Sequence, residues 1–156
     1  MKKKLLFSFL LLLLLSFNSE AGDSLKVFRR MGLYGELGGG EFIHYSMNAE
    51  YYLLNNKLLH LGVRGGYGTW GAFDSGHGPE AIAAATGLLG KRYNFLEIQY
   101  GVDFLLKKPT EPAVSKTKQA VLPLIAIGYN LRYKHFQLKA NVNTTMTINM
   151  GLGLVF

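Results

Sequence analysis

The fold is decided by the stretch Met146-Thr147-Ile148-Asn149-Met150-Gly151-Leu152-Gly153-Leu154-Val155-Phe156, with which the sequence closes. Every even position is large and apolar, and the odd positions are small or polar until Val155. Because successive side chains of a β-strand point to opposite faces, this period of two presents alternate side chains to two different media. The stretch therefore predicts a strand with one apolar and one polar surrounding.

The aromatic residue at the end of this pattern favours a membrane. A soluble domain seldom stops on a bare aromatic in the middle of an alternating strand, whereas a membrane barrel must pair its last strand with its first and leave no edge in lipid. We expect Phe156 to belong to a lipid-facing set with Ile148, Met150, Leu152 and Leu154.

The other end of the chain indicates export. Lys2-Lys3-Lys4 is a basic segment, residues 5–17 are mainly apolar, and Ser19-Glu20-Ala21 provides small residues for a cleavage site. The apolar run is shorter than the about 20 residues needed to span a bilayer. We therefore expect residues 1–21 to be a cleaved signal peptide and residues 22–156 to form one outer-membrane β-barrel domain.

Composition narrows the classes of function. The absence of cysteine excludes a disulfide framework, a thiolate metal site and a lipoprotein anchor. Loss of the signal peptide lowers the formal charge from +7 to +5, because three lysines and one glutamate leave with it. No basic stripe remains, so nucleic acid is not an expected partner. The mildly basic balance is compatible with anionic headgroups, and we expect no metal or cofactor.

Eight segments read as strands with period-two patterning: 30–39, 43–54, 58–69, 81–90, 95–106, 120–132, 136–144 and 146–156. Their polar faces carry Ser, Asn, Gln, Gly, His and a few mixed charges, rather than the many Lys and Glu residues of a water-facing sandwich. The alanine-rich segment 81–90 leaves its facing open. Longer links at 70–80 and 107–119 fall at the same end, as extracellular loops do. The prediction is all-β: an eight-stranded antiparallel up-and-down transmembrane β-barrel.

Several motifs carry a family resemblance: residues 33–40 (Leu-Tyr-Gly-Glu-Leu-Gly-Gly-Gly), residues 45–51 (Tyr-Ser-Met-Asn-Ala-Glu-Tyr), residues 87–91 and residues 127–129. With the barrel pattern, they resemble small eight-stranded outer-membrane proteins of the OmpA/OmpX type, most of all uncharacterised barrels of Bacteroidetes-type bacteria. The resemblance implies the outer membrane of a Gram-negative-type bacterium, reached through the periplasm. It also implies that the barrel-assembly machinery reads Phe156, and it implies no reaction.

Inward-facing polar residues predict a network that fills the barrel. Its expected members are Glu36, His44, Ser46, Asn48, Glu50, His60, Arg64, Glu97, Gln99, Asp103, Lys139 and Asn141. Burying an unpaired charge costs several kcal/mol, so these charges should pair. An eight-stranded barrel has an interior only wide enough for side chains. A network that fills the lumen is therefore the first interpretation, and a narrow solute channel is the alternative.

One stretch offers a catalytic alternative. His44 and Ser46 share a strand face, and Glu50 or Glu36 could orient the imidazole, as in triad chemistry. The stretch resembles the His-x-Ser-Asn-Ala segment of lipid A deacylase barrels, but here Met47 is inserted and the segment lies on the second strand. Its lumen facing also favours a space-filling role.

The expected function is therefore structural or based on recognition by the loops, without catalysis. Outer-membrane lipids and lipopolysaccharide are the expected surroundings, and the sequence does not identify a loop partner. Lys107, Lys108, Lys116 and Lys118 are candidates for contact with lipopolysaccharide phosphates.

Overall fold

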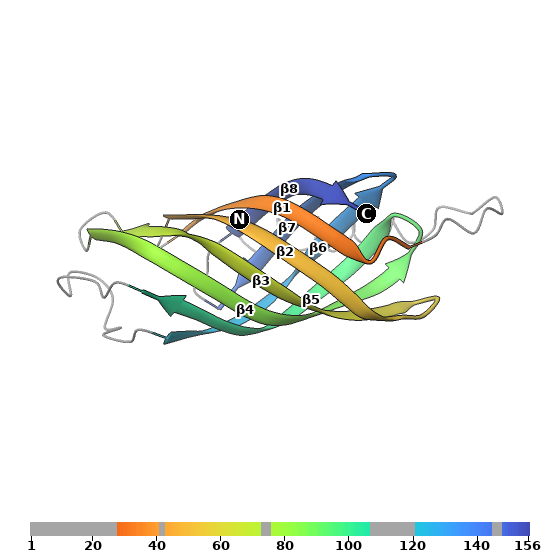
Figure 1. Ribbon diagram of the computed structural model, residues 1–156, viewed down its shortest axis with the longest axis horizontal. Coiled ribbons are helices and arrows are strands. Elements are labelled where there is room, and N and C mark those ends of the chain that lie inside the picture. The colour runs from red at the N-terminus through yellow and green to blue at the C-terminus, as the bar shows by residue number, and fades with distance from the viewer. Residues whose placement is uncertain (1–27, 41–42, 73–75, 107–120, 145–147) are drawn as a thin grey trace, which may run out of the picture.

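The computed structural model describes residues 28–40, 43–72, 76–106, 121–144 and 148–156. These residues form a closed antiparallel barrel in which each strand pairs with its neighbours in sequence (Figure 1). The strands are β1 (Met31–Gly39), β2 (Ile43–Asn55), β3 (Leu59–Ala72), β4 (Gly76–Lys91), β5 (Asn94–Leu105), β6 (Val121–Tyr133), β7 (Phe136–Asn143) and β8 (Ile148–Val155). The predicted all-β, eight-stranded antiparallel up-and-down barrel is confirmed. The predicted signal peptide 1–21 lies outside the described residues.

The barrel closes through a seam between β1 and β8. The register of this pairing runs from Gly32 opposite Val155 to Gly39 opposite Ile148. At its end the amide of Phe156 donates to the carbonyl of Met31 at 2.9 Å, and the amide of Met31 donates back at 3.2 Å. Closure of this kind leaves no strand edge without a hydrogen-bonding partner. No helix in the described residues is long and apolar enough to span a membrane.

The two ends of the barrel differ. One end, the turn end, carries the tight links 56–58, 92–93 and 134–135 together with residues 28–30. Two of these links place a residue in the left-handed region, Arg92 at φ 62° and Lys134 at φ 54°, as tight hairpin turns require. The other end, the loop end, carries the links 40–42, 73–75, 106–120 and 144–147. The predicted long link at 107–119 lies almost wholly outside the described residues.

The predicted long link at 70–80 is wrong. Strand β3 continues to Ala72 and β4 begins at Gly76, so most of this segment is a paired hairpin. Pro79 lies opposite Thr69, and its carbonyl accepts the amide of Leu106 at 3.0 Å. Glycine and proline in this segment suggested a loop, because neither residue favours a strand. At the rim of the barrel, however, the neighbouring strands provide backbone hydrogen-bonding partners, and the segment forms strands. The other strand bounds differ from the prediction by one or two residues.

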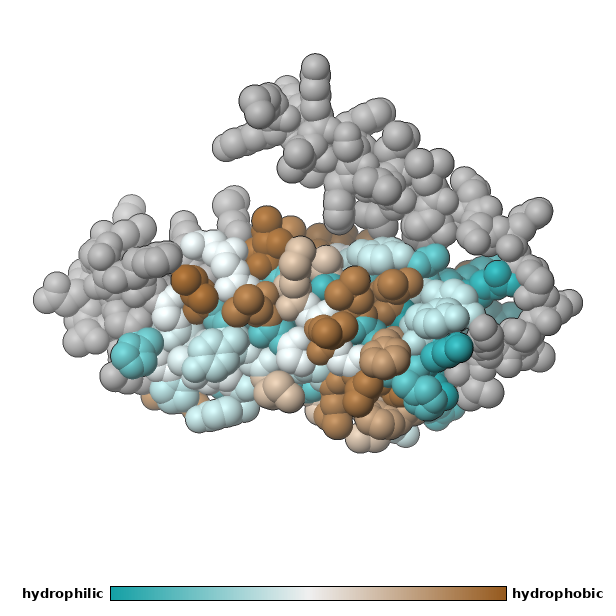
Figure 2. Space-filling model, turned by 90° about the horizontal axis from the view of Figure 1, so that it is seen from above, coloured by the Kyte–Doolittle hydropathy of each residue, from teal (hydrophilic) through white to brown (hydrophobic). Residues whose placement is uncertain are grey.

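The alternation of every strand separates the outer surface from the lumen. Residues facing outward are mostly large and apolar, and Figure 2 shows them as brown side chains over the waist of the barrel. On β4 the even positions turn inward, with Ile82 and Leu88 buried, and the odd positions such as Ala83 face outward. The alanine-rich sequence left the facing of β4 open, and the register of β4 with β3 and β5 determines it.

Candidate functional site

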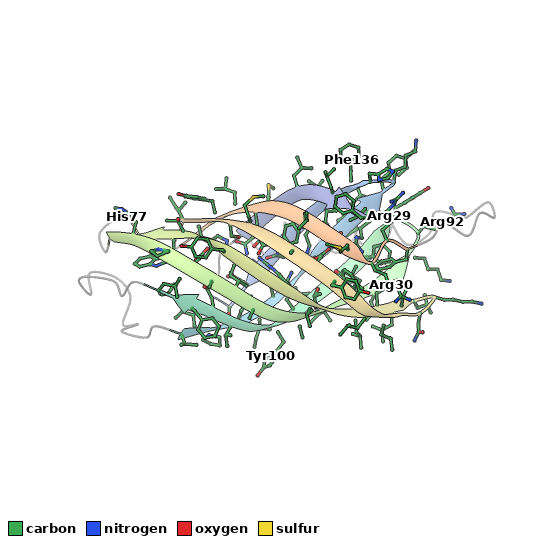
Figure 3. The ribbon with its side chains drawn as sticks, in the orientation of Figure 1. Arg29, Arg30, His77, Arg92, Tyr100 and Phe136 are labelled. Atoms are coloured by element: carbon green, nitrogen blue, oxygen red, sulfur yellow. The ribbon has the colours of Figure 1, made fainter. Side chains whose placement is uncertain are left out.

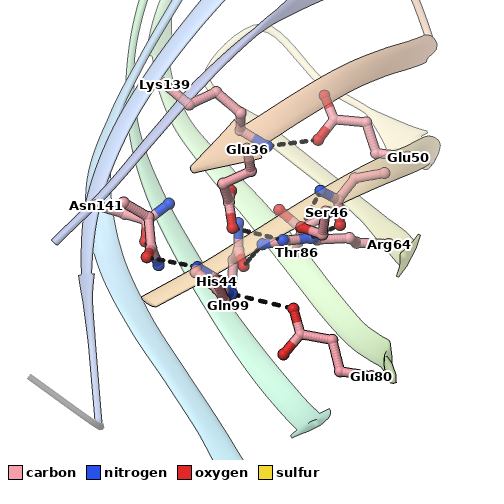
Figure 4. Close-up of polar contacts among 12 residues, drawn as sticks. Glu36, His44, Ser46, Glu50, Arg64, Glu80, Thr86, Gln99, Lys139 and Asn141 are labelled. Atoms are coloured by element: carbon pink, nitrogen blue, oxygen red, sulfur yellow. Dashed lines mark hydrogen bonds and ion pairs between the residues drawn. The ribbon is translucent and has the colours of Figure 1, made fainter. Parts of the chain in front are cut away.

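The centre of the lumen is organised around one buried lysine. Lys139 on β7 lies with its ammonium nitrogen 2.7 Å from Glu50 Oε2 and 2.7 Å from Glu97 Oε1. Glu50 is also 3.1 Å from Arg132 Nη2 on β6. All four side chains are buried, and Figure 4 shows the contact between Lys139 and Glu50 crossing the interior. Two carboxylates therefore share two cations in a region without access to bulk water.

A second hub is the guanidinium group of Arg64 on β3. Its Nη2 donates to Glu36 Oε1 at 2.8 Å and its Nε donates to Asn48 Oδ1 at 3.0 Å. Its Nη1 donates to Gln99 Oε1, and Gln99 in turn donates to Glu97 Oε1 at 2.8 Å. This amide joins the arginine hub to the lysine hub, so the charges form one continuous network across the barrel.

Towards the loop end, His44 is held by both ring nitrogens. Nδ1 lies 3.2 Å from Glu80 Oε1, and Nε2 lies 2.8 Å from Asn149 Oδ1. Asn149 then donates to Asn141 Oδ1 at 2.9 Å. Asp103 also faces this part of the lumen, and its buried Oδ1 has no hydrogen-bond partner among the described residues.

This arrangement differs from the expected triad. Ser46 Oγ accepts a hydrogen bond from Asn48 Nδ2 at 2.9 Å, while the two nitrogens of His44 are engaged elsewhere. Glu50, the expected orienting acid, binds Lys139 and Arg132 instead, and the acid beside His44 is Glu80. Sequence reasoning missed Glu80 because it placed this residue in a link rather than on β4.

An aromatic cluster fills the lumen at the turn end. Phe28, just before β1, stacks on His60 with ring centroids 3.8 Å apart and planes within 3° of parallel. Edge contacts join Phe28 to Tyr52 at 5.3 Å and to Phe95 at 5.8 Å. The guanidinium carbon of Arg132 lies 4.7 Å from the centroid of Phe28. His60 is among the predicted lumen residues, whereas Phe28 is not, because it precedes the first strand and carries no alternation signal.

These sites offer little to a metal ion. Within the described residues, no group of three or more His, Cys, Asp or Glu side chains could hold one. The carboxylates Glu36, Glu50 and Glu97 already bind Arg64, Arg132 or Lys139. The charged groups of the lumen are thus mainly engaged in ion pairs with one another and in hydrogen bonds with side-chain amides.

Comparison with known proteins shows a likeness to a solved structure and to no protein family. No protein family matches the chain, and no curated protein matches it. A solved structure described as "De novo design of transmembrane beta-barrels" is similar to it, with 13% sequence identity and a TM-score of 0.49. The similarity covers 84% of this chain and 97% of the designed one.

Proposed function

We propose that this protein is an outer-membrane β-barrel that acts as a closed scaffold for its loop end, without catalysis. The observation that carries the proposal is the inversion of polarity between lumen and surface. Met47, Leu152 and Tyr100 are 70%, 66% and 71% exposed, whereas Lys139 is 0% exposed. A domain that is stable in water has the opposite arrangement, with its apolar side chains inside, because burial of apolar surface is the main driving force of folding.

The apolar surface extends around the whole barrel. Every strand except β4 contributes several exposed large side chains, and β4 contributes Leu89 and small outward residues. Soluble monomers rarely expose apolar patches beyond a few hundred Å². A closed barrel also pairs the backbone of every strand internally, which is the requirement that lipid imposes. Both properties support insertion into a bilayer.

The lumen supports a scaffold rather than a channel. The contact from Lys139 to Glu50 spans from β7 to β2, and the contact from Arg64 to Glu36 spans from β3 to β1. The cluster around Phe28 fills the turn end below them. The interior of an eight-stranded barrel is just wide enough for side chains to fill, which leaves no open aqueous channel beside them.

The position of His44 and Ser46, the candidate catalytic residues, also favours a scaffold. His44 and Ser46 are buried in the lumen at 8% and 4% exposure, away from the face on which lipid would lie. A lipid ester on the outer surface cannot reach a nucleophile on the other side of the sheet.

The asymmetry of the links supports an orientation in the outer membrane. Periplasmic turns of such barrels are short and extracellular loops longer, so the turn end would face the periplasm. Binding partners would meet the loop end, because loops carry recognition on a rigid scaffold.

Heat-modifiable electrophoresis tests the proposal most directly. The full chain is expressed in a Gram-negative host, and the outer-membrane fraction is run with and without boiling. We expect a folded species in that fraction that migrates differently from the boiled chain and needs detergent to stay in solution. A chain that remains folded and soluble without detergent contradicts the proposal.

Two further measurements separate the scaffold from the alternatives. Cells carrying the native chain or Ser46→Ala should have the same lipid A acylation pattern, and a difference between them would favour the hydrolase. In planar bilayers the purified barrel should give no conductance steps, and regular steps would favour the solute channel.

A further inference from the structure

Charge is distributed in the barrel with a strong bias. All described acidic residues, Glu36, Glu50, Glu80, Glu97 and Asp103, lie at inward-facing positions. The described Lys and Arg side chains that are not buried in the lumen all lie at the turn end, and we call them the basic ring: Arg29, Arg30, Lys57, Lys91, Arg92 and Lys134. No described acid lies among them, so this rim is strongly electropositive rather than mixed.

The basic ring surrounds the barrel instead of gathering on one side. Arg29 and Arg30 precede β1, and Lys57 lies between β2 and β3. Lys91 ends β4, Arg92 lies between β4 and β5, and Lys134 lies between β6 and β7. Figure 3 shows Arg29, Arg30 and Arg92 at the turn end, with His77 at the opposite end. Figure 2 shows strongly hydrophilic side chains gathered at that same end. Each tight turn of the barrel thus supplies at least one cation.

Aromatic side chains mark the level of the ring relative to the apolar surface. Tyr93 and Tyr133 contact each other with ring centroids 5.0 Å apart, and the ammonium nitrogen of Lys134 lies 5.5 Å from the centroid of Tyr133. Tyrosine is enriched at the boundary between hydrocarbon and headgroups. Lysine and arginine next to such a boundary extend their apolar stems along it and place their charge among the headgroups.

We propose that the basic ring binds the phosphate groups of anionic phospholipids in the leaflet at the turn end. This inference rests on the proposed membrane location. The circular arrangement fits a lipid surface, which surrounds the barrel on all sides. A soluble polyanion would need a recess or a one-sided patch, and the mouth that the ring encloses is filled by Phe28 and Arg132.

The size of the effect follows from surface electrostatics. One Lys or Arg near an anionic membrane surface strengthens the association of the protein with that surface by about fivefold. Salt weakens this attraction because it shortens the Debye length. The ring serves one leaflet, so a measurement averaged over both leaflets should show about a twofold to threefold preference for anionic lipid.

The test measures lipid selectivity of the full chain in vesicles of phosphatidylcholine. Spin-labelled phosphatidylglycerol and spin-labelled phosphatidylcholine are added separately, and the motionally restricted fraction of each is compared by electron spin resonance. Insertion is verified first by heat-modifiable migration. We expect the labelled phosphatidylglycerol to be preferred and the preference to fall as sodium chloride is raised.

A pair of charge-matched variants locates the preference. The ring variant K57Q/K91Q/R92Q/K134Q should lose most of it. The comparison variant K107Q/K108Q/K116Q/K118Q removes the same number of lysine or arginine charges from a segment outside the described residues, where contact with lipopolysaccharide phosphates is expected, and should lose less of the preference than the ring variant. Equal loss in both variants would show a net-charge effect and overturn the inference.

The remaining outcomes are equally decisive. If the native chain inserts but shows no preference, the inference fails and the proposed function stands. A barrel that binds soluble heparin without lipid preference would assign the ring to a polyanion and overturn it as well. If the chain does not insert in any vesicle, both the proposed function and this inference fail.

Discussion

Lys139 Nζ lies 2.7 Å from Glu50 Oε2, although the two residues are 89 positions apart and the strands that carry them, β7 and β2, are not neighbours. The contact crosses the lumen over the seam formed by β8 and β1. It therefore joins the last third of the chain to the first third, and it depends on closure of the barrel.

Removing this lysine should destabilise the barrel. Lys139→Met leaves Glu97 without its cation and Glu50 with Arg132 alone, and breaking a buried pair costs about 3–5 kcal/mol. Urea unfolding in detergent micelles should show a much lower midpoint for this variant than for Lys57→Met, which removes an exposed lysine from a turn. Additional E50Q and E97Q substitutions should restore part of the loss. Equal midpoints for the two lysine variants would contradict a structural role of the network.

The β1–β8 seam should tolerate no added methyl group at Gly153. A Cβ there would lie 2.1 Å from the carbonyl oxygen of Leu33 and 2.3 Å from Tyr34 Cβ, whereas a Cβ on Gly65 would meet nothing within 4 Å. Overpacking of this kind costs about 1–3 kcal/mol. We expect Gly153→Ala to lower the unfolding free energy and Gly65→Ala to leave it nearly unchanged. Equal unfolding free energies of the two variants would show that β1 and β8 are less closely packed at Gly153.

A charge on the outer surface should be costly only at the waist. Leu152 is 66% exposed and lies opposite Gly35 in the middle of β1, whereas Leu58 is 50% exposed beside a turn. Arginine on the lipid face costs about 2–4 kcal/mol at the midplane and about 0–1 kcal/mol near the interface. Folding yield into phospholipid vesicles should therefore fall for Leu152→Arg and stay close to native for Leu58→Arg. If Leu152→Arg folds as well as the native chain, the outer face meets water.

The aromatic cluster at the turn end should stabilise the barrel through Phe28. Each aromatic contact contributes about 0.5–1.5 kcal/mol, so loss of the contacts with His60, Tyr52 and Phe95 should cost about 1.5–4.5 kcal/mol. Phe28→Ala should lower the urea midpoint more than Phe136→Ala, which removes the same ring from the outer face. A larger decrease of the urea midpoint for Phe136→Ala would show that the aromatic cluster does not stabilise the barrel.

The predictions from sequence succeeded where the signal was local. The facing of β2 follows from alternate residues such as His44 and Tyr45, and the structure buries the first and exposes the second. The wrong link at 70–80 and the missed residues Glu80 and Phe28 have a different cause. Each depends on a partner far away in the chain: Trp70 pairs with His44, Glu80 faces His44, and Phe28 stacks on His60. A pattern read along one segment does not contain such partners.

On every strand except β4, the sequence by itself determined which residues face the lumen, because the two-residue period of a strand is a property of the local backbone. Only the tertiary structure decided which of them bind one another. Arg64 lies in register with Glu50 on the adjacent strand, yet its guanidinium binds Glu36, and Glu50 binds Lys139. Strands in a closed barrel tilt against its axis, so residues paired along the backbone lie at different heights in the lumen. Tilt and closure therefore select the ion pairs.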